Sequence, residues 1–199
     1  MISLEIVLVV IAYVSGSIPF GYLFTKKFAG LNLFELGSGN IGSTNVKRVA
    51  GKKVALLTQL CDMTKGLLPV LLVVLLNRFY PELLSPLILY LVALSSIFGH
   101  NFSIFLKFRG GKGVNTTLGA SVLIAPYSVF ISVAVYYLVK WRFRYVSAGS
   151  LALAVALPLS YVLLFPISFT TYYLLLVAVL IIWRHVGNIQ RLFQGTENK

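Results

Sequence analysis

The sequence predicts an all-α integral membrane protein with about seven transmembrane helical segments. Two observations carry this prediction. The chain of 199 residues is 58% hydrophobic but only 11% charged, whereas a soluble domain has about 25% charged residues. Its apolar residues also fall in runs of roughly the 20 residues that a spanning helix needs. A soluble fold of this length could not bury so much apolar surface, so the bilayer is the natural solvent.

Five apolar runs are long enough to cross a membrane as single helices. They are 3–24, 54–76, 83–106, 146–165 and 168–184. Pro19 predicts a kink in the first helix, where neighbouring helices can satisfy the freed carbonyl. Asp62 and Lys65 stand at i and i+3 in the second helix, and this spacing predicts an internal ion pair.

A sixth apolar stretch, 114–139, carries Pro126 near its middle, and we expect it to turn back there as two arms of about 13 residues. The net charge is +12, and the basic residues lie between the apolar runs, as the positive-inside rule describes. If the stretch turns back, every basic residue except Lys65 and Arg78 lies on the cytoplasmic side. The sequence therefore predicts an outside N-terminus, an inside C-terminus and a single transmembrane domain, 1–199.

The strongly basic balance could also suit nucleic acid, but its placement between apolar runs favours membrane lipids as partners and no nucleic acid. Cys61 is the one cysteine, so neither a disulfide framework nor a cysteine metal cluster is predicted. We expect no cofactor and no metal.

The first polar motif is GSGNIGSTNVKR, residues 37–48, interpreted as a loop that ends in Lys47 and Arg48. It fits G-x-G-x-x-G, but no strand precedes it, which excludes a dinucleotide fold. Glycines let backbone N–H groups approach an anion closely, and Arg48 can form a forked contact with phosphate. Further side-chain donors are Ser38, Asn40, Thr44 and Asn45. The alternative is a flexible membrane loop.

The second motif is GHNFSIFLKFRGGKG, residues 99–113. Gly110, Gly111, Lys112 and Gly113 should open a helix, and a helix N-terminus after a glycine turn suits an anion. It is not a Walker A loop, because the spacing differs and Gly113 replaces the Ser or Thr. A basic turn that only sets topology is the alternative. For His100 and Asn101, at the end of an apolar helix, structural hydrogen bonding is the favoured role.

The third motif is WRHVGNIQRLFQGTE, residues 183–197. His185 and Asn188 are spaced to share one helical face, and histidine titrates near neutral pH. Glu197 is twelve residues beyond His185, so the sequence gives no nearby carboxylate to orient the imidazole. The alternative is a basic juxtamembrane tail.

Together these motifs resemble the acyl-phosphate:glycerol-3-phosphate acyltransferases, the PlsY family of bacterial phospholipid synthesis. The resemblance runs from Gly16-Ser17-Ile18-Pro19 through all three motifs to Gly195-Thr196-Glu197. Departures from the family pattern occur at Ser103, Asn115 and Val186-Gly187. The H-x-x-x-x-D motif of other glycerolipid acyltransferases is absent, since Phe105 and Gln190 stand five residues after the two histidines.

The resemblance implies transfer of a fatty acyl group from acyl phosphate to the 1-position of glycerol 3-phosphate, at the cytoplasmic face of the bacterial inner membrane. It implies that glycerol 3-phosphate is held by Ser38, Arg48, Lys107, His185 and Asn188. The glycine-rich segments, including Gly110, Gly111, Lys112 and Gly113, would cradle phosphate. We expect Gly39, Asn40, Thr44 and Asn45 to face the acyl phosphate.

Two questions stay open at this point. The proton acceptor is either His185 or a phosphate of the substrates, whose second pKa is about 6. A small transporter of phosphorylated solutes is the alternative function, although transporters usually place their polar site near the bilayer midplane.

Overall fold

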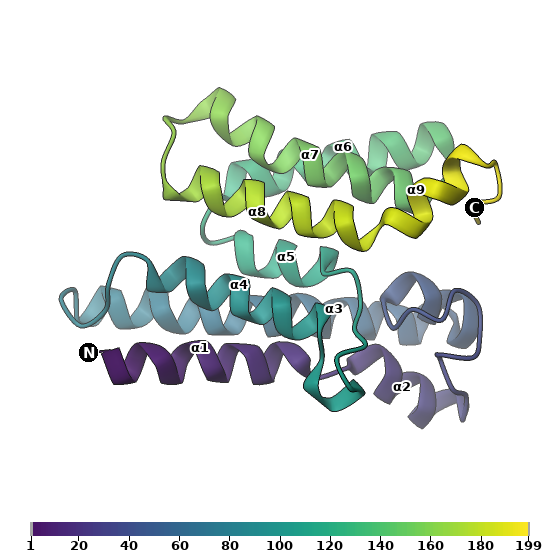
Figure 1. The fold of residues 1–199 in the computed structure, drawn as a ribbon, viewed down its shortest axis with the longest axis horizontal. Coiled ribbons are helices and arrows are strands. Elements are labelled where there is room, and N and C mark those ends of the chain that lie inside the picture. Colours follow the sequence, from purple (N-terminus) through teal and green to yellow (C-terminus); the bar gives the residue numbers. More distant parts are fainter. Residues whose placement is uncertain (1, 199) are drawn as a thin grey trace. The chain divides into compact units, whose positions relative to one another are not determined.

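The computed structural model describes residues 2–198, and its regular structure in that range is entirely helical (Figure 1). The helices are α1 (Ile2–Ser17), α2 (Phe20–Ala29), α3 (Ser43–Phe79), α4 (Ile88–Asn101), the 3-10 helix η1 (Ile104–Leu106), α5 (Val114–Ser121), α6 (Pro126–Phe143), α7 (Val146–Leu164), α8 (Phe169–Arg184) and α9 (Val186–Phe193). The chain divides into two compact units, Met1–Leu123 and Ile124–Lys199. The all-α prediction is confirmed.

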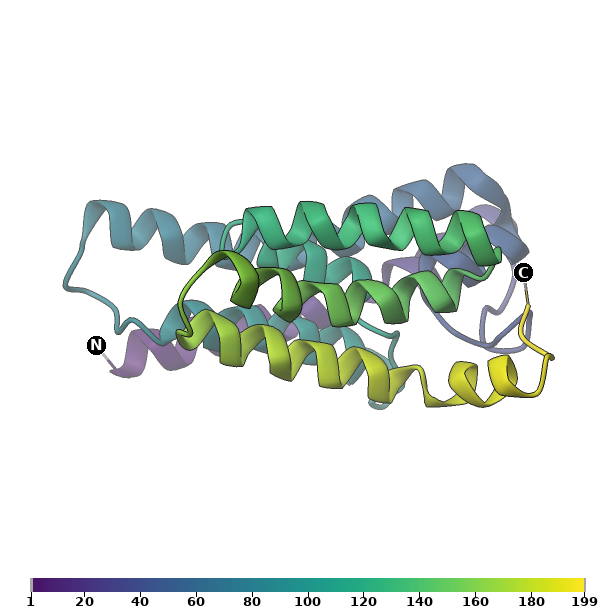
Figure 2. The same cartoon turned by 90° about the horizontal axis from the view of Figure 1, so that it is seen from above.

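In the first unit, α1 packs along α4, and α3 packs against α2, α4 and α5 (Figures 1 and 2). One buried apolar cluster joins α1, α3, α4 and the segment between α3 and α4, and it consists of Leu8, Ala12, Val73, Leu84, Ile88 and Val92. Glycines let α1 and α4 touch: a Cβ on Gly16 would lie 2.2 Å from the carbonyl oxygen of Ser96. Such close backbone packing is typical of membrane helices.

The break at Pro19 is confirmed. Helix α1 ends at Ser17 and α2 begins at Phe20, because proline lacks an N–H and its ring clashes with the preceding turn. The second piece runs to Ala29, five residues beyond the predicted end. Gly30 stops it with φ +68° and an N–H that donates to the carbonyl of Lys26, as a left-handed C-terminal glycine does.

Helix α3 begins at Ser43, eleven residues before the predicted start at 54, and this corrects the reading of 37–48 as one loop. Only 37–42 precedes the helix, so Lys47 and Arg48 lie on α3. Gly51, with φ +85° and ψ +175°, interrupts the helix between this first part and the apolar span. The sequence pattern identified the apolar part alone, because 43–53 is polar.

The stretch 114–139 does not form the two equal arms of about 13 residues that the sequence predicted. Helix α5 has 8 residues and α6 has 18, which gives about 12 Å and about 27 Å of helix. Pro126 is the first residue of α6, where its missing N–H and fixed φ favour helix initiation. The proline therefore does mark a helix boundary, but the two arms are unequal.

Within residues 2–198, four segments are long and apolar enough to cross a membrane: Leu4–Ala29, Ser43–Phe79, Ile88–Leu106 and Val146–Leu164. The pair α8 and α9 would make a fifth, bent by 57° between its two parts. Large apolar side chains on α1, including Ile6, Val10 and Ile11, are more than half exposed, as expected of a surface that faces lipid. The count of seven crossings stays a prediction.

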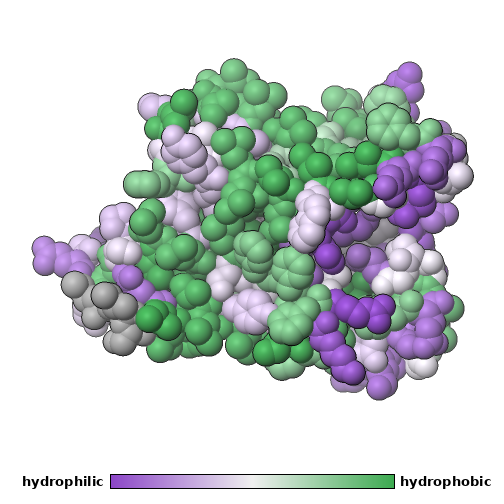
Figure 3. All heavy atoms as spheres, viewed as in Figure 1, coloured by the Kyte–Doolittle hydropathy of each residue, from purple (hydrophilic) through white to green (hydrophobic). Residues whose placement is uncertain are grey.

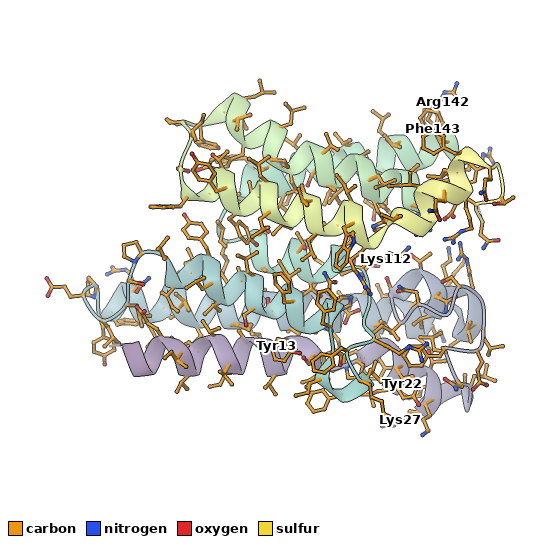
Figure 4. All side chains as sticks on the ribbon, in the orientation of Figure 1. Tyr13, Tyr22, Lys27, Lys112, Arg142 and Phe143 are labelled. Carbon is orange, nitrogen blue, oxygen red and sulfur yellow. The ribbon has the colours of Figure 1, made fainter. Side chains whose placement is uncertain are left out.

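In the second unit, α6, α7 and α8 run side by side, and α9 turns away from the axis of α8 (Figures 1 and 2). Arg142 and Phe143, near the end of α6, are exposed and point outward (Figure 4). The hydrophilic surface of this unit gathers over α9 and the end of α6 (Figure 3). In the first unit it gathers over α2 and the chain that follows α2, and α1 and α4 present a mainly hydrophobic surface.

Candidate active site

Asn45 holds the first loop, defined as Gly37–Gly42, from within. Its Oδ1 accepts a hydrogen bond from the N–H of Ser38 at 2.9 Å, and its Nδ2 donates to the carbonyl of Leu36 at 3.0 Å. The side chain is 1% exposed. Gly37 and Gly39 have φ of +61° and +66°, a conformation that only glycine adopts readily. The loop is therefore ordered by a buried amide and by two glycines.

This geometry gives Asn45 a structural role in the loop, and the expectation that it faces the acyl phosphate stays a prediction. The amide is turned inward, and its hydrogen bonds fix the loop backbone. Asn40 also contributes to the loop, since its Oδ1 accepts from the N–H of Gly42 at 2.9 Å, which makes an Asx turn directly before α3. Ser38 is exposed and Thr44 is half-buried, so both remain near the surface.

Arg48 is exposed on α3, about one helical turn after Thr44. This spacing places it on the same side of the helix as Thr44. The guanidinium thus stands near the helix N-terminus, whose first backbone N–H groups have no partner within the helix. That combination suits an anion.

The second loop, defined as Lys107–Gly113, begins with two residues in left-handed conformation. Lys107 has φ +53° and Phe108 has φ +63°, which costs of order 1–3 kcal/mol for each residue. Hydrogen bonds from the N–H of Phe108 to Ser103 (2.8 Å) and from the N–H of Arg109 to Leu106 (3.0 Å) hold this turn. Lys107 is exposed. The strained turn projects a basic side chain from a defined backbone.

The glycines of the second loop rest on the end of α4. The N–H of Gly111 donates to the carbonyl of His100 at 3.0 Å. A Cβ on Gly110 would lie 2.2 Å from that carbonyl oxygen, and one on Gly111 would lie 2.1 Å from Nε2 of the His100 ring. A Cβ on Gly113 would lie 2.8 Å from Oδ1 of Asn101. The sequence suggested these glycines for anion binding, and the structure adds close packing as a second reason.

Helix α5 begins at Val114, so the prediction that the glycine turn opens a helix is confirmed. Lys112 is labelled in Figure 4 on the segment that leads into α5. The helix packs on α3 through small residues: a Cβ on Gly66 would lie 2.2 Å from the carbonyl oxygen of Thr116, and one on Gly119 would lie 1.9 Å from that of Met63.

Two contacts link the segments that carry the two loops. Asn115 Nδ2 donates to Ser43 Oγ at 3.1 Å, which joins the starts of α5 and α3. The Arg109 guanidinium carbon lies 4.5 Å from the centre of the Phe34 ring, a cation–π contact. The first unit therefore brings the segment that carries Lys107 together with the one that carries Ser38 and Arg48, although Lys107 is far from both in the sequence.

The third motif lies in the second unit, at the 57° bend between α8 and α9. His185 is 2% exposed, and its Nδ1 lies 2.8 Å from the carbonyl oxygen of Ile181. Because a carbonyl can only accept, Nδ1 carries the proton and Nε2 is the basic nitrogen of the neutral ring. Asn188 is 7% exposed, and its N–H donates to the carbonyl of His185 at 2.8 Å. The bend thus orients both side chains.

The chain after α9 folds back, so that Glu197 contacts Asn188 and Arg191. The sequence did not predict this contact. Glu197 Oε1 accepts from Asn188 Nδ2 at 2.6 Å and Glu197 Oε2 accepts from Arg191 Nε at 2.8 Å. Gly195, with φ +69°, reverses the chain after α9. Burial raises the pKa of the Glu197 carboxyl, but the hydrogen bond from Asn188, the Ser147 hydroxyl, and the hydrogen bond and charge of Arg191 bring that pKa below its ordinary value. The carboxylate orients Asn188, and Ile181 orients His185.

Comparison with known proteins identifies the family. The sequence pattern of a family described as glycerol-3-phosphate acyltransferase matches residues 6–195. A glycerol-3-phosphate acyltransferase of Clostridium acetobutylicum is 41% identical over 96% of this chain and 98% of its own length. One of Rubrobacter xylanophilus is 40% identical over 98% of this chain and 95% of its own length.

Two solved structures are similar along most of the chain. Both are described as PlsY (YgiH), an integral membrane glycerol 3-phosphate acyltransferase, in a glycerol 3-phosphate form and in a lysophosphatidic acid form. The first is 34% identical with a TM-score of 0.87, and the second is 33% identical with a TM-score of 0.85. Each match covers 98% of this chain and 94% of the solved one. This chain therefore belongs to the glycerol-3-phosphate acyltransferase family, with the integral membrane fold of PlsY.

Proposed function

We propose that the protein transfers a fatty acyl group from acyl phosphate to the 1-hydroxyl of glycerol 3-phosphate, which gives lysophosphatidic acid and inorganic phosphate. The observation that carries this proposal is the similarity, over 98% of the chain, to a PlsY structure in a glycerol 3-phosphate form. Similarity to the lysophosphatidic acid form supports the product. Family membership favours acyl transfer over the transporter alternative.

The first unit would supply most of the charge that the two phosphates need. Ser38, Arg48 and Lys107 are exposed, and we assign them to glycerol 3-phosphate. Gly39, Asn40 and Thr44 are assigned to the acyl phosphate, and the loop Gly110–Gly113 to a substrate phosphate. Arg48 is the strongest candidate for a two-pronged phosphate contact, because its planar guanidinium matches two phosphate oxygens.

The chemistry is a direct transfer. The 1-hydroxyl oxygen forms a bond to the acyl carbonyl carbon, and the bond from that carbon to the phosphate oxygen breaks. The hydroxyl proton passes to a substrate phosphate, and inorganic phosphate leaves. Acyl phosphate is a mixed anhydride with a good leaving group, so orientation and charge stabilisation can supply much of the rate.

His185 is then mainly a binding residue, with Asn188 beside it. The Nδ1 of His185 is held by the backbone carbonyl of Ile181, whereas a carboxylate often holds that nitrogen in a catalytic histidine base. His185→Gln should raise the KM for glycerol 3-phosphate and preserve most of the turnover number. A collapse of turnover at saturating substrates, restored by added imidazole, would identify His185 as the base instead.

Arg48→Lys tests the assignment of the phosphate contact. Lysine keeps the charge but loses the two-pronged geometry, so the KM for glycerol 3-phosphate should rise by about tenfold or more. The KM for acyl phosphate should change less. A KM for glycerol 3-phosphate close to that of the wild type would remove Arg48 from the site.

The topology proposal is an outside N-terminus, an inside C-terminus and seven segments that form a single functional domain, in a bacterial inner membrane with the active site on the cytoplasmic side. The basic residues at the end of α6, Lys140, Arg142 and Arg144, support it through the positive-inside rule. A cysteine at Arg142, in a Cys61→Ser background, should resist a membrane-impermeant reagent added to intact cells. Ready labelling from outside would overturn this topology.

A further inference from the structure

Asp62 and Lys65 on α3 and His100 on α4 form a buried polar cluster that the proposed reaction does not use. Their exposed fractions are 2%, 5% and 4%. Asp62 Oδ1 lies 2.9 Å from Lys65 Nζ and 3.6 Å from His100 Nδ1. The first contact is an ion pair, and the second is too long for a hydrogen bond, so it orients the imidazole electrostatically.

Lys65 ties this cluster to the break between α1 and α2. Its Nζ donates to the carbonyl of Ile18 at 2.8 Å and lies 5.7 Å from the centre of the Phe20 ring. A cation is favourable at the C-terminal end of a helix, where carbonyl groups carry partial negative charge. The ammonium therefore joins the proline break to α3 and balances the Asp62 carboxylate.

His100 ties the same cluster to the second loop. Nδ1 of the ring faces Asp62, and Nε2 lies 2.1 Å from the position that a Cβ on Gly111 would occupy. The His100 carbonyl also accepts the N–H of Gly111 at 3.0 Å. Because the ring lies between the carboxylate and the loop, the direction that Asp62 imposes on the ring fixes where the loop can rest.

Stability alone does not explain such a cluster. Removing two charges from water is costly, and well-packed apolar replacements of a buried pair are often neutral or stabilising. What the charged pair adds is a fixed orientation for His100, which an apolar pair cannot supply. The chain between α4 and the second loop is also bonded to the end of α1, since Ser103 Oγ donates to the carbonyl of Ser17 at 2.6 Å.

We propose that Asp62, Lys65 and His100 are positioning residues that set the shape of the loop Gly110–Gly113 for a substrate phosphate. None of the three needs to touch substrate. The cluster acts through the ring of His100 and the backbone of Gly111, so its loss should weaken phosphate binding and leave the transfer step largely intact. This inference rests on the proposed function, because it assigns that loop to a substrate phosphate.

The test replaces the pair by apolar residues of similar size, Asp62→Leu with Lys65→Met, in protein reconstituted in nanodiscs. The double variant leaves no unpaired buried charge, so it should unfold at or above the wild-type temperature. The KM for glycerol 3-phosphate should nevertheless rise by about tenfold, with the turnover number within about threefold of the wild type. Asp62→Asn alone leaves Lys65 without its carboxylate. This single variant should raise the KM for glycerol 3-phosphate and, unlike the double variant, should lower the unfolding temperature.

Hydrogen exchange supplies a readout that is independent of activity. Backbone amides of 110–116 should exchange faster in the double variant, whereas those of 37–42 should keep the wild-type rate. Ser95→Ala is the matched control. It removes the hydrogen bond of 2.8 Å from Ser95 Oγ on α4 to the carbonyl of Val9, and this bond does not involve the loop. Ser95→Ala should change neither KM nor exchange at 110–116.

The outcomes separate the two proposals. Wild-type protein that does not acylate glycerol 3-phosphate would refute the proposed function. An active wild type, together with a stable double variant that keeps both the wild-type KM and the wild-type exchange, would refute the positioning role. A double variant that loses stability and activity in proportion would show that the cluster only supports folding.

Discussion

The first and second loops have similar glycine-rich sequences, but different forces hold them. In the first loop, Gly37 and Gly39 are needed for positive φ, and the side chains of Asn45 and Asn40 bind the backbone. In the second loop, the positive φ values at the start belong to Lys107 and Phe108, and Gly110 and Gly111 are needed because the end of α4 leaves no space for a Cβ. Similar composition therefore hides two different reasons for glycine.

The largest expected effect is that of Gly110→Ala. The new Cβ would lie 2.2 Å from the backbone oxygen of His100, which cannot move without a shift of α4. Overpacking of this kind costs about 1–3 kcal/mol, and a displaced loop should raise the KM for glycerol 3-phosphate by at least about tenfold. Steady-state kinetics and thermal unfolding of the purified variant measure both effects.

Gly187→Ala is the control for that substitution. It lies in α9, and its new Cβ would approach Arg191 only to an ordinary 3.5 Å. Alanine favours a helix over glycine by about 1 kcal/mol, so stability should hold or rise. If Gly110→Ala behaved like Gly187→Ala, the second loop would not depend on its contact with α4.

Asn45→Ala should be next in size. It removes the acceptor for the Ser38 N–H and the donor to the Leu36 carbonyl, at about 1–3 kcal/mol for buried groups left unsatisfied. The first loop should loosen while the second keeps its shape. Hydrogen exchange at 37–42 should accelerate without a change at 110–113, and equal acceleration in both loops would contradict separate supports.

Gly37→Ala and Gly39→Ala refine the comparison within the first loop. Both substitutions place alanine at positive φ, at a cost of about 1–2 kcal/mol. The Cβ at position 37 would also meet Asn45 Oδ1 at 2.2 Å, whereas at position 39 the nearest atom is 3.1 Å away. Gly37→Ala should therefore lower the free energy of unfolding more than Gly39→Ala does. Part of that difference should disappear in an Asn45→Ala background, where the contact is absent. Thermal unfolding of the four variants measures this, and strictly additive effects would refute the contact.

The sequence predicted the helical class and the polar motifs, because both depend on local pattern: runs of apolar residues, Pro19 at a helix break, and a glycine turn before α5. It could not predict that α3 begins at Ser43. The residues 43–53 are polar, so no apolar periodicity marks them as helical, and Gly51 does interrupt the helix.

Roles that depend on long-range packing were not visible in the sequence. In the sequence, Asn45 cannot be told apart from the neighbouring polar residues that could bind an anion. Only the fold shows that its amide is turned inward. Glu197 is twelve residues from His185, so its return to Asn188 depends on the reversal at Gly195. The Asp62–Lys65 spacing predicted the ion pair, but the third partner, His100, comes from another helix.

The smallest expected effect is a dependence of thermal stability on pH. It should arise from the Glu197 carboxylate, which holds Asn188, because that group titrates, whereas the Asn45 amide, which holds the first loop, does not. The pKa of Glu197 is lowered in the folded protein. Its stabilising contribution is complete above the unfolded-state pKa of about 4.3, and it is lost as pH falls from that value through the folded-state pKa.

Glu197→Gln tests this contribution. At about pH 7 the wild type should unfold at a slightly higher temperature than the variant, and the difference should shrink as the pH falls below about 4. Asn45→Ala should instead lower the unfolding temperature by a similar amount at both pH values. A difference for Glu197→Gln that grows on acidification would contradict the lowered pKa.

The most direct test of the proposed function compares acyl donors for the purified protein with glycerol 3-phosphate as acceptor. With acyl phosphate, lysophosphatidic acid and inorganic phosphate should appear in equal amounts, and Arg48→Lys should lower the rate at limiting glycerol 3-phosphate. With acyl-CoA as the donor, no lysophosphatidic acid should form. Equal rates with acyl-CoA, or release of phosphate without acylation of glycerol 3-phosphate, would contradict the proposed reaction.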